Sequence, residues 1–232
     1  RAETGCRTDL SRLAFGGLMT KIIAIDGPAG SGKSSVSKQV ARSLGYGYLD
    51  TGAAYRALAW AVANGAVTGD LGENLADFDY SISLNPDDFW VRVGETDVTS
   101  AIRSTEIAEN VSKVAQVPAV RAYMKSLTRR LVSESGLPGV VVEGRDITTV
   151  VAPDAENRIL LTASEEVRLK RRSAELGPNG AAQVAKQVTD RDKSDAKVVD
   201  FMTPAPGVDL VDTSDLNFEQ SVSAVLSLVE RG

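Results

Sequence analysis

The segment GPAGSGKS, which starts at Gly27, has the residue types and spacing of a phosphate-binding loop. It fits the pattern Gly-x-x-x-x-Gly-Lys-Ser/Thr, with Lys33 and Ser34 at the last two positions. In such a loop the glycines let backbone N–H groups face the phosphates, the lysine neutralises phosphate charge, and the hydroxyl ligates Mg²⁺. An apolar run, KIIAID, precedes the segment and a helical one follows it. We therefore expect a nucleotide-binding loop with Ser34 as the Mg²⁺ ligand.

A second group of charged residues lies in the segment VVVEGRD. Glu143, Arg145 and Asp146 directly follow three valines, at the predicted carboxyl end of a buried strand. Open α/β sheets bind ligands at such strand ends, so we favour a functional cluster over a structural one. Arg56, five residues after Thr51, can face the same cleft, although a single arginine is more often a solvated residue. Our hypothesis is that these residues form the site for a phosphate acceptor.

The elements that would position these residues alternate between strands and helices. Buried strands are predicted at 21–26, 46–50, 139–142, 157–164 and 207–214. Helices are predicted at 33–44, 51–64, 104–115, 118–135, 165–176, 181–195 and 217–230. We expect Thr51 to cap the second helix and Gly65 to end it. This order predicts an α/β fold whose parallel, doubly wound sheet is flanked by helices.

Three short segments between residues 77 and 102 follow a different pattern. DFDYSISL, DFWVRVG and TDVTSAI alternate apolar and polar residues and are separated by turn-forming sequences. Such short alternating runs are typical of antiparallel strands. We therefore expect a small antiparallel sheet inserted in the α/β core.

The composition excludes several kinds of chemistry. The 232 residues include no histidine and a single cysteine, Cys6, which rules out a Ser-His-Asp triad, a histidine-bound metal and a cysteine-built zinc site. The net charge of −5 argues against nucleic-acid binding. No apolar run reaches the ~20 residues of a membrane helix, and residues 1–18, before Met19, do not read as a secretory signal. We interpret them as a disordered N-terminal extension of a cytoplasmic protein.

Several longer segments resemble the bacterial cytidylate kinases, a family of P-loop nucleoside monophosphate kinases. They include IAIDGPAGSGKS, YLDTGAAYR, VSKVAQVPAVR, VVEGRDITTVVAPDA and TDRDKSD, and they run from about residue 21 to the end of the chain. The resemblance implies transfer of the γ-phosphate of ATP to CMP or dCMP with Mg²⁺. It also implies one kinase domain, 19–232, with a monophosphate-binding insert at about 64–120 and a short helical lid, followed by a sugar-contacting helix, at about 164–195.

The same resemblance assigns roles to individual residues. The residues implied to hold ATP are Gly27, Gly30, Ser31, Gly32, Lys33, Ser34 and Ser35. Those implied to hold CMP are Thr51, Arg56 and Arg145 for the phosphate, Ser112, Arg121 and Asp146 for the base, and Arg191 and Asp195 for the sugar. Those implied to act in catalysis are Lys33, Arg145, Arg168 and Arg172, with Arg168, Arg171 and Arg172 in the lid. One position departs from the family: Val198 stands where members often carry arginine.

Other interpretations stay open at this point. Another P-loop kinase, acting on UMP, AMP or shikimate, shares the loop but not the small-sheet insert. A P-loop protein whose ATP turnover needs nucleic acid is disfavoured by the acidic charge. Asp146 could pair with Arg56 or Arg145 and hold them in place, rather than contact the base. We expect a monomer that binds ATP and CMP or dCMP, with no nucleic-acid or membrane partner.

Overall fold

The computed structural model describes residues 20–73, 75–176, 192, 196 and 199–231. The predicted N-terminal extension lies outside these residues, as do most of the predicted lid and nearly all of the helix predicted at 181–195. Three single positions of interest, Arg191, Asp195 and Val198, also lie outside them. The described residues contain the phosphate-binding loop, the VVVEGRD segment and the predicted insert.

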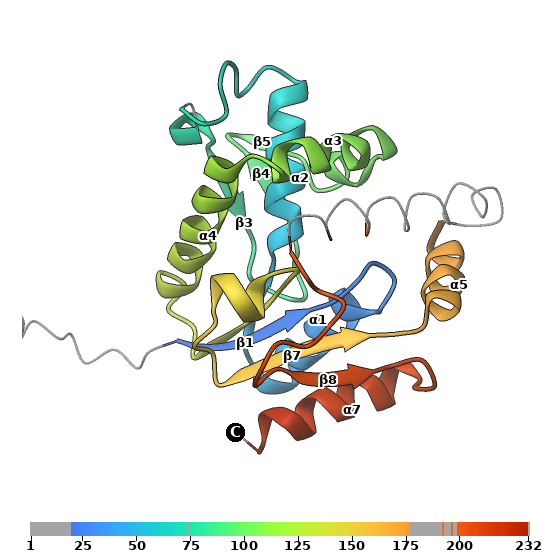
Figure 1. The fold of residues 1–232 in the computed structure, drawn as a ribbon. Helices are drawn as coiled ribbons and strands as arrows, with labels where there is room; N and C mark the ends of the chain where they lie inside the picture. Colours follow the sequence, from blue (N-terminus) through green and yellow to red (C-terminus); the bar gives the residue numbers. More distant parts are fainter. Residues whose placement is uncertain (1–19, 74, 177–191, 193–195, 197–198, 232) are drawn as a thin grey trace, which may run out of the picture.

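A five-stranded parallel sheet forms the centre of the molecule (Figure 1). Its strands are, in spatial order, β2 (Gly47–Asp50), β6 (Gly139–Gly144), β1 (Lys21–Asp26), β7 (Asn157–Thr162) and β8 (Asp209–Asp212). The registers place Asp26 beside Gly144 and Asp50 beside Glu143. The polar ends of β1, β2 and β6 therefore meet at one edge of the sheet, where open α/β folds bind their ligands.

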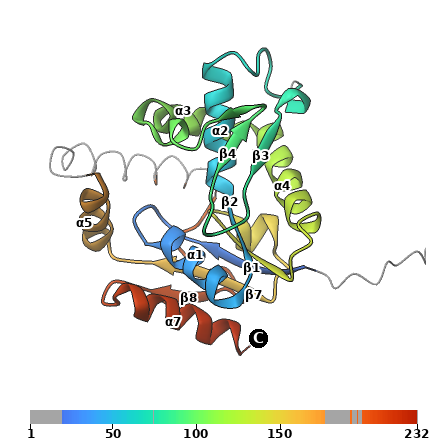
Figure 2. The same ribbon diagram turned by 180° about the vertical axis from the view of Figure 1, so that it is seen from behind.

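Two hydrophobic cores form because successive strand residues point to opposite faces of the sheet. Ile23 and Ile25 of β1 pack on one face, with α1 (Lys33–Leu44) and α7 (Phe218–Val229). Ala24 belongs to the other core, with α2 (Thr51–Ala63) and α4 (Pro118–Ser133). Figure 2 shows α1 and α7 together on one side of the sheet. Among the described residues, no helix is long and apolar enough to cross a membrane.

The small sheet consists of three antiparallel strands, β3 (Tyr80–Ile82), β4 (Val91–Val93) and β5 (Thr96–Asp97). It packs in the same core as α2, α4 and α3 (Thr105–Ala115). Short 3₁₀ turns flank it at η2 (Leu75–Asp77) and η3 (Ala101–Arg103). Its β3–β4 loop also contacts the main body, since Arg42 Nε of α1 donates to Asp87 Oδ1 at 2.6 Å.

The fold class predicted from the sequence is confirmed, including the parallel sheet, the flanking helices and the small antiparallel sheet. The helix α5 (Glu165–Leu176) also begins and ends where the sequence predicts. The expected cap of α2 is wrong: Asp50, not Thr51, is the N-cap, and its Oδ1 accepts from Ala53 N at 3.0 Å. Thr51 is instead the first residue of the helix, and its hydroxyl donates to the backbone oxygen of Glu143 at 2.8 Å.

Candidate nucleotide-binding site

The phosphate-binding loop connects β1 to α1 and packs closely against neighbouring backbone. Gly27 and Gly30 have φ angles of 154° and 76°, in a region that favours glycine. A Cβ atom at Gly27 would lie 2.1 Å from the carbonyl oxygen of Leu161, and one at Gly30 would lie 2.6 Å from that of Arg168. Gly32 is the N-cap of α1, so the unpaired N–H groups of the first turn lie at the loop. These groups and the helix dipole favour an anion there.

Lys33 and Ser34 lie in the first turn of α1, as the loop pattern requires. Lys33 Nζ donates to the carbonyl oxygen of Pro28 at 3.5 Å. Its charge also acts on Asp26, Asp50 and Glu143, the carboxylates at the ends of the three neighbouring strands. The loop therefore places one cation beside a group of acidic side chains. This arrangement binds a phosphate only if further positive charge is supplied.

Glu143 is almost completely buried, as Asp26 is, and each has 2% of its surface exposed. Its Oε1 accepts a hydrogen bond from the Tyr48 hydroxyl at 2.5 Å, whereas Oε2 has no partner among the described residues. Burial, followed by repulsion from Asp50, raises the pKa of Glu143, and Lys33 and Ser34 oppose this shift. A buried carboxylate oxygen beside the Ser34 hydroxyl is an oxygen donor of the type that Mg²⁺ prefers.

Asp50 and Arg56 form a buried ion pair, with Asp50 Oδ2 and Arg56 Nη2 2.7 Å apart. Burial alone would raise the pKa of Asp50, but the charge of Arg56 and the N–H of Ala53 lower it below its ordinary value. Asp50 thus caps α2 and holds Arg56, which lies one and a half turns further along the helix. The sequence analysis assigned no role to Asp50.

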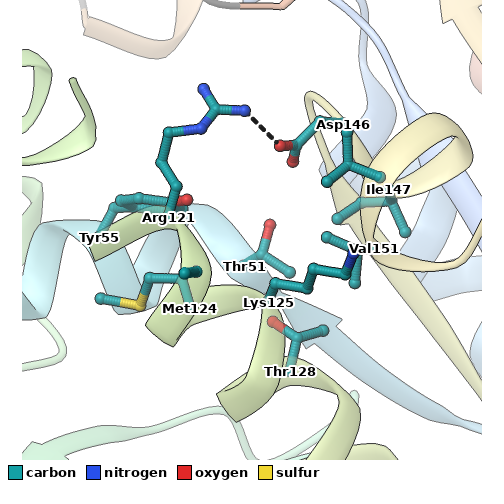
Figure 3. Close-up of a pocket in the computed structure, with 11 residues that line it drawn as sticks. Thr51, Tyr55, Arg121, Met124, Lys125, Thr128, Asp146, Ile147 and Val151 are labelled. Carbon is teal, nitrogen blue, oxygen red and sulfur yellow. Dashed lines mark hydrogen bonds and ion pairs between the residues drawn. The ribbon is translucent and has the colours of Figure 1, made fainter. Parts of the chain in front are cut away.

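A cavity of about 110 Å³ lies between α2, α4 and the segment after β6 (Figure 3). Three of the residues predicted to hold CMP line it: Thr51, Arg121 and Asp146. Figure 3 shows Arg121 and Asp146 from opposite walls, with Arg121 Nη2 3.0 Å from Asp146 Oδ2. The remaining lining residues, which the sequence analysis did not single out, are Tyr55, Ala122, Met124, Lys125, Thr128, Ile147, Val150 and Val151.

The partner of Asp146 decides one alternative left open by the sequence. Asp146 pairs with Arg121, not with Arg56 or Arg145, so it does not hold the two arginines predicted for the phosphate. The segment after it forms one π-helical turn, η4 (Ile147–Val151). Asp26 holds that turn, because its carboxylate accepts from the N–H groups of Ile147 and Thr148 at 2.9 and 2.8 Å.

The other described residues predicted for CMP, which are Arg56, Ser112 and Arg145, are not among those that line this cavity. Arg145 Nη1 contacts Asp192 Oδ1 at 2.8 Å, and its guanidinium carbon lies 4.2 Å from the centre of the Phe201 ring. Ser112 lies in α3 and is not one of the residues that line the cavity. Arg191 and Asp195, which were assigned to the sugar, lie outside the described residues.

Two arginines of α5, Arg168 and Arg171, contact the phosphate-binding loop. Arg168 is buried, and its Nη1 donates to the carbonyl oxygen of Ala29 at 3.0 Å. Arg171, which the family resemblance places in the lid, contacts both the loop and the residue after β8. Its Nη1 donates to Ser31 O and Thr213 Oγ1 at 3.2 and 2.9 Å, and its Nη2 donates to Thr213 O at 2.8 Å, which connects the loop to the end of β8. Arg172 is half-buried on the same helix.

The chain matches a family model over nearly its whole length. Residues 23–231 fit the model described as cytidylate kinase. The chain belongs to the cytidylate kinase family. A cytidylate kinase from Cutibacterium acnes is 42% identical over 214 residues, covering 90% of this chain and 95% of that protein. One from Streptomyces avermitilis is also 42% identical over 214 residues, with 90% and 92% covered. The resemblance noted in the sequence is confirmed.

One solved structure is also similar to this chain in its fold. A crystal structure described as an uncharacterized protein from Eubacterium ventriosum has a TM-score of 0.53, with 92% of this chain and 100% of that chain covered. The two sequences are 12% identical. This similarity concerns the fold alone, so it assigns no role to individual residues of this chain.

Proposed function

We propose that this protein transfers the γ-phosphate of ATP to CMP or dCMP, giving ADP and CDP or dCDP. The observation that carries the proposal is the cavity bounded by Arg121 and Asp146, which opens beside the edge of the sheet where the phosphate-binding loop begins. A charged pair of this kind suits a polar ring with both donors and acceptors. Membership of the cytidylate kinase family supports cytosine as that ring.

On the donor side, we assign the ATP phosphates to Gly27, Gly30, Ser31, Gly32, Lys33, Ser34 and Ser35. The loop backbone and the start of α1 would bind phosphate oxygens, and Lys33 would neutralise part of their charge. The Ser34 hydroxyl and the unpartnered Oε2 of Glu143 fit Mg²⁺, which takes oxygen ligands. When bound, the ion would neutralise charge on the β- and γ-phosphates.

On the acceptor side, we assign the CMP phosphate to Thr51, Arg56 and Arg145. These residues follow β2 and β6, so they lie at the same edge of the sheet as the loop. We assign the cytosine ring to Arg121 and Asp146. An ionised carboxylate only accepts hydrogen bonds, which matches the exocyclic amine of cytosine and not the carbonyl oxygen of uracil. Ser112, Arg191 and Asp195 stay predictions that rest on the family resemblance.

The reaction itself needs no histidine or nucleophilic side chain. An oxygen of the acceptor phosphate forms the new P–O bond while the bond to the β-phosphate bridging oxygen breaks and ADP leaves. The protein must hold two polyanions in line and offset their repulsion. Lys33, Arg56, Arg145 and Arg168 supply the positive charge for this, and we also assign a catalytic role to Arg172. A lid at about 164–195, together with an insert at about 64–120, would exclude water.

The test of this function is a panel of acceptors measured with ATP and Mg²⁺. The panel contains CMP, dCMP, UMP, AMP and shikimate, and the readout is ADP formation. We expect kcat/KM to be highest for CMP or dCMP. A higher value for AMP or shikimate would assign the protein to a different P-loop kinase activity. A monomeric state, a cytoplasmic location and a place in pyrimidine nucleotide metabolism stay predictions.

Replacing Asp146 by asparagine should reduce the preference for CMP over UMP. The amide adds a donor that suits the uracil oxygen and removes the charge that suits the cytosine amine. We expect kcat/KM for CMP to fall more than that for UMP, which lowers their ratio by about tenfold to a few hundredfold. Asp87→Asn, at an exposed aspartate that pairs with Arg42, is the matched control and should leave the ratio unchanged. If kcat/KM fell by the same factor for CMP and UMP, Asp146 would have no role in recognising the base.

The preference for CMP should also weaken at low pH. Burial raises the pKa of Asp146 above the ordinary aspartate value, Arg121 opposes the shift and Asp26 adds to it. The carboxylate is therefore fully ionised only above this raised pKa, and its protonated form donates a hydrogen bond. We expect the CMP/UMP ratio of kcat/KM to be highest where this carboxylate is ionised and to fall as the pH is lowered through its raised pKa. In Asp146→Asn the ratio should fall less at low pH, and only the part that comes from protonation of cytosine itself should remain. An identical pH dependence in both proteins would contradict the prediction.

A further inference from the structure

Asp192 lies where three parts of the nucleotide-binding site meet. Its Oδ1 accepts from Arg145 Nη1 at 2.8 Å and from the backbone N–H of Ala29 at 3.2 Å. Its Oδ2 accepts from Arg168 Nη1 at 2.5 Å. Asp192 is 8% exposed, so these contacts are largely shielded from water. A single carboxylate thus connects the segment after β6, the phosphate-binding loop and α5.

The donors around Asp192 are of the kind that bind phosphate. Two guanidinium groups and a loop N–H converge on its two oxygens. Burial opposes ionisation, but the charge of Arg145 and the hydrogen bonds from Arg145, Ala29 and Arg168 hold the pKa of Asp192 below its ordinary value. The carboxylate is therefore ionised at neutral pH. It offsets the repulsion between two arginines that would otherwise separate, since like charges in a buried site disfavour each other.

Arg168 keeps a donor for a ligand while it contacts Asp192. Arg168 uses Nη1 for both Asp192 and Ala29 O, and its buried Nε has no hydrogen-bond partner among the described residues. A guanidinium carries five N–H donors in a rigid fork, so fixing one nitrogen orients the others. Leaving a buried donor unpaired has a cost. This suggests that Arg168 Nε is satisfied by a group that the bound nucleotides bring.

We propose that Asp192 is a positioning residue for phosphoryl transfer, which holds the guanidinium groups of Arg145 and Arg168 beside the phosphate-binding loop, where their charge offsets that of the donor and acceptor phosphates. The proposal rests on the function proposed above. Arg145 belongs to the acceptor side and Arg168 to the donor side. Asp192 therefore couples the two halves of the site without contacting the reacting atoms.

The test is Asp192→Asn, which keeps the shape of the side chain and one acceptor oxygen but removes the charge. We expect kcat to fall by about 10- to 100-fold, because small displacements of catalytic groups have effects of this size. The KM values for ATP and CMP should change much less, since most phosphate contacts persist. The matched control is Asp200→Asn, at an exposed aspartate of the following segment that accepts from Met202 N. It should behave as wild type.

Three other outcomes would overturn the proposal. A lower melting temperature with unchanged kcat, measured well below that temperature, would assign Asp192 a structural role only. A lower KM with unchanged kcat would mean that Asp192 merely competes with phosphate for the arginines. A fall in KM and kcat by the same factor, which leaves kcat/KM unchanged, would indicate loss of ground-state strain rather than of positioning.

A second variant decides the question if Asp192→Asn does not fold. Asp192→Glu keeps the charge and moves the carboxylate outward by one methylene, so kcat should fall with KM nearly unchanged, and wild-type kcat would overturn the proposal. The wild-type protein is assayed first with the acceptor panel. If it prefers another acceptor, the proposed function fails, and the Asp192 variants are compared with wild type on that acceptor instead.

Discussion

Lys33→Ala is expected to lower kcat to below about 1% of the wild-type value, because one preorganised positive group at developing phosphate charge is worth about 10²- to 10³-fold or more. Lys33 is the cation at the start of α1, and its charge lies beside Asp26, Asp50 and Glu143. Without it, the phosphates of ATP would meet these carboxylates unshielded. The measurements are steady-state turnover of CMP with ATP and the affinity for a non-hydrolysable ATP analogue.

The fold should survive this change. Lys33 is half-buried and belongs to neither hydrophobic core, and the hydrogen bond from its Nζ to Pro28 O is long at 3.5 Å. Circular dichroism should therefore be that of the wild type. The matched control is Lys21→Ala, at an exposed lysine of β1 that pairs with Glu156, and it should retain full activity. Near-normal turnover by Lys33→Ala would show that the loop does not act on the transferred phosphate.

Arg145→Lys should also reduce kcat strongly, by about 10²- to 10³-fold, even though it keeps the positive charge. The guanidinium of Arg145 pairs with Asp192 and stacks on Phe201 at 4.2 Å, a geometry that an ammonium group does not reproduce. The remaining N–H donors would then no longer be aimed at the acceptor phosphate. The measurement is kcat with CMP at saturating ATP.

The matched control for Arg145 is Arg42→Lys, which changes an exposed arginine that also pairs with an aspartate, Asp87. This variant should keep wild-type kcat. If Arg145→Lys retained kcat as well, the planar fork would be unnecessary and the charge alone would account for any contribution. The prediction that the guanidinium geometry of Arg145 is needed for transfer would then be wrong.

Sequence patterns predicted the fold well because each pattern reports a local property. The run of valines before Glu143 indicated a strand buried on both faces, and β6 is buried throughout. The helix α1 begins at Lys33 and ends at Leu44, as expected, since glycine caps both of its ends. The three short alternating segments also became the small sheet. These features depend on periodicity and turn chemistry, which a single sequence contains.

The partners of the charged residues were harder to predict. Nothing in the segment LDTGAAYR tells whether Asp50 or Thr51 caps α2, because both residue types are good caps. In the structure Asp50 is the cap, and the Thr51 hydroxyl donates to the backbone oxygen of Glu143 in the neighbouring strand. Arg121 and Asp146 are 25 residues apart in the chain, and only the family resemblance brought them together in advance. Asp192 was overlooked because its role depends on two arginines from distant elements.

The order of the strands has a consequence for how the two substrates are spaced. The loop follows β1, and Arg145 follows β6, which is hydrogen-bonded to β1 with Asp26 opposite Gly144. The loop and the Arg145 segment therefore start from two adjacent strands, which lie about 4.8 Å apart. A slip of one residue between β1 and β6 would move the two ends apart by about 3.3 Å and turn every side chain of one strand to the other face. The hydrogen bonds between β1 and β6 therefore fix the relative position of the two segments that follow these strands.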